Sequence, residues 1–243
     1  MNGYRVLPKL VAWDMKVQAR EHVYFFTVLS TLAFAIALAL LPDQAPDTVV
    51  TGILFLDPAV VGIGFVGGII LMERSQNTLA ALAVSPARPS DYVASKIITL
   101  TLLTFAGGMA LVCVAYWPVS PDRALRFTIT MAFTGALAVV GGVVLVASAN
   151  SMNHLIARAF PVAVMLYLPF LAHFNVVEGL WAWILFGINP GHAMLRALLW
   201  AADPANVSAI EAIYAFSYMG LLIAILFVWA LRLFHDNISR GAT

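Results

Sequence analysis

Residues 73–96 read ERSQNTLAALAVSPARPSDYVASK and form the longest polar stretch of the chain. Two almost entirely apolar runs flank this stretch, at about 49–72 and 97–116. Each run has roughly the 20 residues that a helix needs to cross the ~30 Å hydrocarbon core of a bilayer. The pattern therefore predicts two membrane helices joined by a polar loop at the membrane surface.

The composition of the whole chain agrees with a membrane protein. Of its 243 residues, 62% are hydrophobic and only 10% are charged, whereas about 25% of residues are charged in an ordinary soluble domain. The net charge of +1 provides no broad basic surface for nucleic acid. The single cysteine, Cys113, lies in an apolar run, so no disulfide framework is possible and packing is its expected role.

Apolar runs of bilayer length recur outside the central pair, at about 24–41, 127–149, 156–174 and 212–234. Together with 49–72 and 97–116 they predict an all-α integral membrane protein with six spans in one domain, 1–243. Pro161 and Pro169 lie inside the fifth run, which is therefore expected to be kinked.

Residues 1–23 precede the first span and interleave charges with apolar residues. The apolar positions recur at roughly helical spacing, at Leu7, Leu10, Val11, Met15 and Val17. This spacing predicts an amphipathic helix at the membrane surface. A plain solvated helix is the alternative interpretation.

The segment 178–201 is apolar but is interrupted by Asn189, Pro190 and Gly191. Each arm has about ten residues, too few to cross a bilayer. We expect an outer re-entrant or interfacial helical hairpin, with tryptophans at the headgroup level. One bent transmembrane helix remains the alternative.

Lys and Arg are distributed unequally between the two sides of this topology. The N-terminal segment, the 73–96 loop, the 150–160 link and the C-terminal end hold ten of them, whereas Arg123, Arg126 and Arg196 fall on the other side. Because cytoplasmic loops carry the excess of Lys and Arg, both termini are predicted to be cytoplasmic.

The central loop has the pattern of a docking element. Residues 78–84 are expected to form a short helix that Ser85-Pro86 ends, and Ser90 is expected to cap the helix that enters the third span. A short surface helix between two membrane helices can press against a partner and transmit force to both.

This loop resembles the first cytoplasmic loop of the type-2 ABC transporter permease family, Glu-x-x-x-Gly-Thr-Leu-Glu-x-Leu-x-x-Ser/Thr-Pro followed by Tyr-x-x-x-Lys. The residues that match in register are Glu73, Thr78, Leu79, Leu82, Ser85, Pro86, Tyr92 and Lys96. Asn77 replaces the usual Gly, and Ala80 replaces a frequent acid, which puts in doubt any salt bridge made there. The run Gly64-Phe-Val-Gly67-Gly68 and the pair Asp91-Tyr92 resemble, more narrowly, the permeases of actinobacterial fluoroquinolone exporters.

The resemblance implies a permease subunit that exports a lipophilic small molecule or a lipid through the plasma membrane. It implies that two copies of a cytoplasmic ABC ATPase dock on the loop and that a second permease copy or a sister permease completes the pathway. No G-x-x-x-x-G-K-[ST] phosphate loop occurs in the sequence, so no cofactor is expected in this chain and ATP would bind to the partner. The implied ATPase-coupling residues are Glu73, Arg74, Asn77, Thr78, Leu79, Leu82, Ser85 and Pro86.

Asp57 is the only acid well inside a predicted span, and such residues are costly enough to suggest a role in transport. It is therefore a candidate for the translocation pathway. The alternative is structural, because Asp57-Pro58 also has the pattern of a helix N-cap followed by proline.

Gly64 and Gly68 have the spacing of a close helix–helix contact and are candidate dimer contacts. The five histidines show no metal-site spacing, although His173, Glu178 and His192 would form a proton-linked cluster if the fold brought them together. Rival functions are a proton-coupled secondary transporter that uses Asp57, a haem-exporter-like permease, and a membrane enzyme, for which no clustered catalytic set is present.

Overall fold

The computed structural model describes residues 6–42, 44–59, 64–76, 88–149 and 151–241, and the regular elements in these ranges are all helical. Four segments have the length and apolarity to cross a bilayer: Pro89–Ala115, Pro121–Ala147, Met152–His173 and Ala209–Phe234. Helices α1 (Leu7–Arg20) and α2 (Val23–Ala39), bent by 68° at their junction, provide a fifth when they are taken together. The chain is an all-helical, multi-pass membrane protein.

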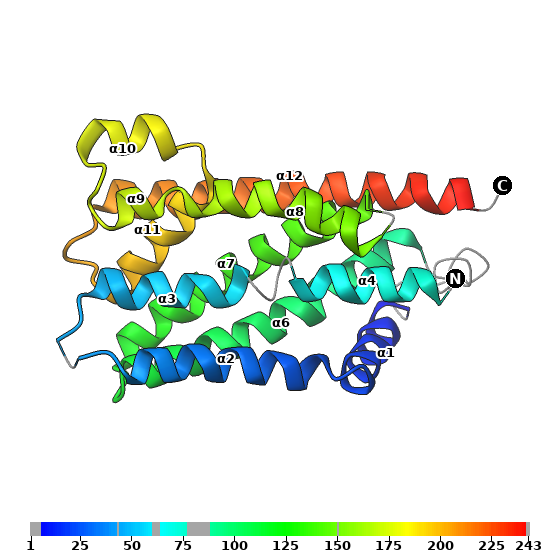
Figure 1. Cartoon of the computed structure of the whole chain (residues 1–243), viewed down its shortest axis with the longest axis horizontal. Coiled ribbons are helices and arrows are strands. Elements are labelled where there is room, and N and C mark those ends of the chain that lie inside the picture. The colour runs from blue at the N-terminus through cyan, green and yellow to red at the C-terminus, as the bar shows by residue number, and fades with distance from the viewer. Residues whose placement is uncertain (1–5, 43, 60–63, 77–87, 150, 242–243) are drawn as a thin grey trace.

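Most helices run lengthwise through one elongated bundle, and α1 turns across one end of it (Figure 1). Helices α3 (Asp47–Ala59) and α4 (Val66–Ser75) follow each other along the bundle, on either side of residues 60–63, which the structure does not describe. The last turns of α12 (Ala209–Gly241) lie at the same end as α1. That end also holds the junction from α4 to α6.

Proline sets several helix boundaries. Helix α6 (Pro89–Ala115) begins eight residues before the predicted third span, with Pro89 at its first position and Arg88 as its N-cap. The prediction of Ser90 as the cap is therefore wrong, because Pro89 already fits the first turn, where its missing N–H is not needed. The expected kink in the fifth span is the break between α8 (Met152–Tyr167) and α9 (Phe170–His173), which falls at Pro169, whereas Pro161 stays inside α8.

The segment after α9 forms two helices of different character. Helix α10 (Gly179–Phe186) stands away from the bundle (Figure 1) and exposes Leu180, Trp181, Ile184 and Leu185. Helix α11 (Pro190–Ala202) packs inside the bundle, with most of its residues buried between α3, α7 and α12. Its small residues allow this close packing, since alanine recurs at Ala193, Ala197 and Ala201.

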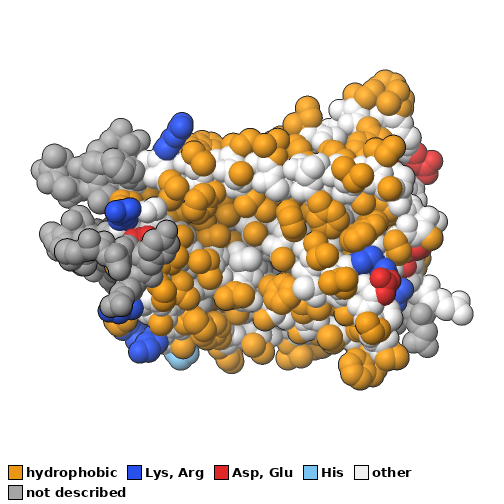
Figure 2. Space-filling model, turned by 180° about the vertical axis from the view of Figure 1, so that it is seen from behind, with side chains coloured by type: hydrophobic (Ala, Val, Ile, Leu, Met, Phe, Trp, Pro, Cys, Tyr) orange, Lys and Arg blue, Asp and Glu red, His pale blue; other side chains and the backbone are white. Residues whose placement is uncertain are grey.

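The core follows α7 (Pro121–Ala147), whose most apolar stretch is 67% buried, against 17% for the last two spans. Outside this core the surface is apolar. Figure 2 shows a middle band of hydrophobic and uncharged side chains, with Lys and Arg gathered at one end and acidic and basic groups mixed at the other. On this face lipid can surround the band, because the charged side chains in view lie toward the two ends.

Candidate functional site

A buried ion network joins three helices at the end of the bundle where α4 leads to α6. The Lys96 side chain on α6 is 1% exposed, and its Nζ lies 2.7 Å from Oδ1 of Asp14 on α1. The same ammonium also pairs with Oε1 of Glu73 on α4. One cation thus holds the surface helix and both helices that flank residues 77–87.

Hydroxyl groups complete the network. Tyr92 donates to Oε2 of Glu73 at 2.6 Å, and Ser95 donates to Oδ2 of Asp14 at 2.5 Å. Tyr92, Ser95 and Lys96 are three and four residues apart, so one face of α6 presents all three. Every carboxylate oxygen of the two acids therefore has a partner, as burial of these groups requires.

Two further contacts extend the network to neighbouring turns. The Gln18 amide on α1 donates to Oγ1 of Thr99 on α6 at 2.8 Å. The Arg74 guanidinium on α4 donates to the carbonyl oxygens of Ala147, at 2.8 Å, and Ala149, at 2.5 Å, and so caps the C-terminal end of α7. Four helices are joined at this end.

The structure describes only part of the predicted coupling set. Glu73 and Arg74 lie in the network, where Glu73 is 4% exposed. The other six positions of the set, and with them the predicted short helix 78–84, lie outside the described residues: Asn77, Thr78, Leu79, Leu82, Ser85 and Pro86. Asp14 was missed by sequence reasoning because it is 82 residues from Lys96, and its only signal was an acid on the buried side of an amphipathic helix.

Asp57 lies in the last turn of α3 and is fully buried. Its Oδ1 accepts a hydrogen bond from Thr31 of α2 at 3.1 Å, and its Oδ2 has no hydrogen-bond partner among the described residues. Because α3 continues through Asp57 and Pro58 to Ala59, Asp57 does not precede a helix, and the N-cap interpretation does not hold for this part of the chain.

The glycine-rich run at α4 has two different faces. A Cβ at Gly64 or Gly68 would meet no atom within 4 Å, so these two candidate dimer contacts leave room for a neighbour. A Cβ at Gly67 would overlap the side chain of Leu155 on α8. Gly67, rather than Gly64 or Gly68, is therefore the glycine that packing within the chain requires.

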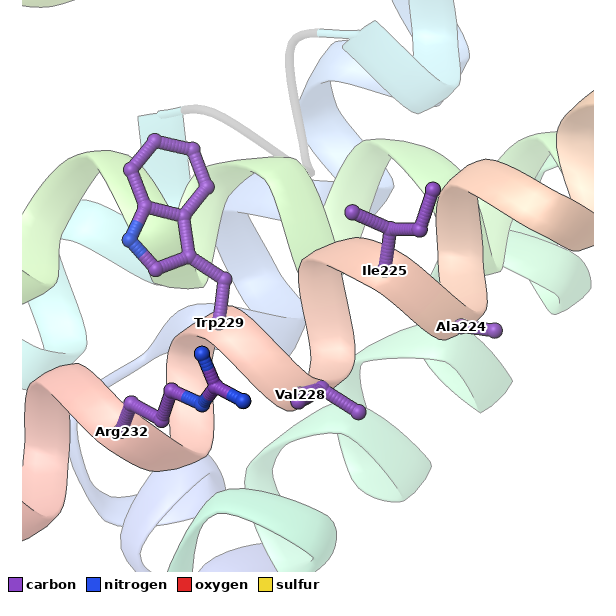
Figure 3. Close-up of a pocket in the computed structure, with 5 residues that line it drawn as sticks. All are labelled: Ala224, Ile225, Val228, Trp229 and Arg232. Atoms are coloured by element: carbon purple, nitrogen blue, oxygen red, sulfur yellow. The ribbon is translucent and has the colours of Figure 1, made fainter.

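Helix α12 contributes to two apolar hollows. Figure 3 shows five side chains of this helix around the first, of about 500 Å³: Ala224, Ile225, Val228, Trp229 and Arg232. Trp229 also lines the second, a groove of about 370 Å³ between α7, α8, α11 and α12 in which no lining residue is charged. These surfaces suit lipid or an apolar ligand.

The opposite end of the bundle holds the three arginines that the topology assigned to the other side. Arg196 pairs with Glu211 at 3.6 Å. Arg126 pairs with Asp122 and donates to the carbonyl oxygen of Ala201 at 3.1 Å. The Arg123 guanidinium lies 4.7 Å from the centre of the Tyr116 ring. Arg126 and Arg196 thus hold α7, α11 and α12 together, while Arg123 contacts the residue that follows α6.

The histidines of the proposed proton-linked cluster have separate neighbours. His173 contacts the carbonyl oxygen of Thr48 at 2.8 Å, and His192 packs against the ring of Trp183 at 5.1 Å. Glu178 is exposed and bonds to neither. No group of three or more His, Cys, Asp or Glu suited to a metal ion occurs among the described residues.

Comparison with known proteins places these features in a family. The model of the fluoroquinolones export permease protein family matches residues 6–240 of the chain. Two curated relatives, the fluoroquinolones export permease proteins of the CDC 1551 and H37Rv strains of Mycobacterium tuberculosis, are each 24% identical over 214 residues, which covers 88% of this chain and 88% of each relative.

Proposed function

Because the chain belongs to the fluoroquinolones export permease protein family, we propose that it is the membrane subunit of an ATP-driven exporter that moves a lipophilic, drug-like molecule or a lipid outward. Two copies of a separate ABC ATPase would supply the energy, and two permease chains would form the pathway. The absence of a G-x-x-x-x-G-K-[ST] phosphate loop from the sequence supports this division of labour.

The observation that carries the ATP-driven part of the proposal is the network around Lys96. Residues 77–87 connect α4 to α6, and the Glu73–Lys96 pair ties these two helices together at the points where they meet that connection. A force applied to the loop by an ATPase would therefore move both helices and, through Asp14, the surface helix α1. Such rigid transmission is what switching between inward-open and outward-open states requires.

The proposed topology has six spans. They are α2, α3 with α4, α6, α7, α8 with α9, and α12. An even number of spans places α1 and the end of α12 on one side, in keeping with their common position in Figure 1, and the excess of Lys and Arg there favours the cytoplasm. Helices α10 and α11 then form the outer re-entrant hairpin, with Trp181 of α10 exposed at the headgroup level.

A second permease copy is proposed to pack on Gly64 and Gly68, where the chain itself leaves space. Disulfide cross-linking of a Gly68→Cys variant in a Cys113→Ala background tests this contact. A cross-linked species at twice the chain mass is expected in membranes, and its absence would count against the contact.

The deciding experiment is affinity purification of the tagged chain from its native host in mild detergent, followed by mass spectrometry and an ATPase assay. A phosphate-loop ATPase is expected to co-purify, and Leu79→Asp is expected to abolish the association by placing a charge on an apolar position of the proposed docking loop. Ala80→Glu is the matched control, because the family often has an acid at that position. If the Leu79→Asp variant still co-purifies with the ATPase, the loop is not the docking site.

A second candidate function, proton-coupled secondary transport, is favoured by one observation, the buried carboxylate of Asp57, whose Oδ2 has no hydrogen-bond partner within the part of the chain that the structure describes. It predicts that the chain purifies alone and that transport follows the proton gradient. Co-purification of an active ATPase would exclude it.

A further inference from the structure

An apolar groove of about 360 Å³ lies between α2 and α6, on the outer surface of the bundle. Its volume is within the range of small-ligand sites, roughly 300–1,000 Å³. Among its lining residues, Thr27 and Thr31 alone have polar side chains; the others are Val28, Leu32, Ala35, Leu103, Ala106, Gly107, Ala110, Leu111 and Val114. Several lining residues, including Ala106 and Ala110, are exposed on the surface of the bundle, so a ligand can enter from the lipid.

The Asp57 carboxylate lies directly beneath this groove. Thr31, which donates to Asp57 Oδ1, is a lining residue from α2. Gly107, a lining residue from α6, lies next to the same carboxyl group. A Cβ added at this position would lie 3.1 Å from Asp57 Oδ2 and 3.0 Å from Thr31 Oγ1. The absence of a side chain at position 107 is therefore what keeps the floor of the groove next to the unpaired oxygen.

An ionised carboxylate at this depth is costly unless a cation or several donors offset its charge. Thr31 supplies one donor to one oxygen, and Oδ2 has none among the described residues. No Lys, Arg or His lines the groove. The carboxylate is therefore open to a cation that arrives from outside the chain, and the apolar walls suit a cation whose remaining part is apolar.

We propose that the groove between α2 and α6 binds lipophilic molecules that carry a protonated amine, and that the ammonium pairs with Asp57. This inference rests on the proposed function, because it assigns a chemical class to the exported cargo. In the described state Oδ2 is shielded from solvent. A small separation of α2 from α6 at Thr31 and Gly107 admits the ammonium, so binding is linked to helix movement.

The test uses the full chain in lipid nanodiscs and two fluorescent probes, dansylcadaverine, which carries a primary ammonium, and its neutral N-acetyl derivative. Dansylcadaverine is expected to bind at least about tenfold more tightly than the N-acetyl derivative, because only its ammonium can form a charged hydrogen bond with the carboxylate. Equal affinities of the unaltered chain for the two probes would overturn the proposal, whatever the variants do.

Two variants localise the site. Asp57→Asn keeps the shape of the side chain and is expected to remove the preference for the amine, leaving the N-acetyl derivative unaffected. Gly107→Ala keeps the carboxylate but fills the space beside it, and is expected to lower the affinity for dansylcadaverine about tenfold or more. Gly141→Ala, which lines the groove between α7 and α12 and has no atom within 4 Å of its new Cβ, is the matched control and is expected to bind normally.

Loss of binding in Gly141→Ala, with Gly107→Ala unaffected, would place the amine in the other groove and overturn the proposal. Failure of the exporter proposal gives a different result. If no ATPase co-purifies but dansylcadaverine still binds in an Asp57-dependent way, the amine site stands and the ATP-driven mechanism falls. If an ATPase co-purifies and the probes bind equally, the mechanism stands and the amine site falls.

Discussion

Lys96 holds the loop end of the bundle together, because among the described residues it is the cation that lies between two buried acids. Its replacement by Met keeps much of its length but leaves Asp14 and Glu73 without an opposite charge. Breaking a buried pair in this way costs about 3–5 kcal/mol. We expect Lys96→Met to lower the midpoint of thermal unfolding in detergent markedly, relative to Lys16→Met at an exposed position of α1.

Asp14→Asn should behave differently from Lys96→Met. It removes one of two negative charges and leaves a balanced Glu73–Lys96 pair, while the Asn amide oxygen can still accept from Lys96 and its NH2 group can donate to Ser95 Oγ. The expected loss of stability is therefore much smaller, on the order of 1 kcal/mol. Equal destabilisation by the two variants would show that charge balance does not govern the network.

The residues of this network also show what sequence can and cannot predict about a site. Glu73, Tyr92 and Lys96 were recognised because they lie close to one another along the chain, in a loop with a family pattern. Asp14 and Gln18 were not recognised, because their partners depend on how α1 folds across the bundle, as the sequence separation of 81 between Gln18 and Thr99 illustrates. Thr31 and Gly107 were missed beside Asp57 for the same reason.

At the scale of elements, the close contact between α8 and the start of α11 depends on Gly191. A Cβ at this position would overlap the backbone carbonyl oxygen of Leu166, which cannot move as a side-chain tip can. Asn189 stabilises the same contact by donating a hydrogen bond to the carbonyl oxygen of Met165 at 2.5 Å. Gly191→Ala must therefore push the two helices apart, at a cost of about 1–3 kcal/mol.

The measurement is the midpoint of thermal unfolding of Gly191→Ala in detergent, compared with Gly141→Ala. Both changes add one methyl group to a helix, but the new Cβ at position 141 meets no atom within 4 Å. A clear decrease is expected at position 191 alone. Similar midpoints for the two variants would mean that α8 and α11 separate at little cost.

Hydropathy predicts the membrane helices and their order, but it does not predict where helices break or how deeply each is buried in the protein. Apolar runs predict spans because the bilayer thickness sets the length of a spanning helix, so α2, α6, α7 and α12 each overlap a predicted span, although α6 begins eight residues before its span. Burial of α11 could not be predicted in this way: exposure to lipid and burial in protein select the same apolar residues, and Ala193, Ala197 and Ala201 became meaningful only once α3, α7 and α12 surrounded them.

At the scale of the whole molecule, the two ends differ in their charges. Lys9, Lys16 and Arg20 of α1 lie at the same end as Arg74 and Lys96, whereas Arg123, Arg126 and Arg196 lie at the other end. The side of a membrane protein that carries the excess of Lys and Arg near its spans stays in the cytoplasm during insertion. The molecule should therefore insert with α1 and the end of α12 inside the cell.

Cysteine labelling of intact cells tests this orientation in a Cys113→Ala background. Ser75→Cys lies at the exposed end of α4, and Ala205→Cys lies in the exposed connection between α11 and α12. A membrane-impermeant maleimide is expected to label Ala205→Cys on intact cells and to label Ser75→Cys only after the cells are permeabilised. Labelling of Ser75→Cys from outside would reverse the orientation, and an ATPase in the cytoplasm could then not reach the loop between α4 and α6.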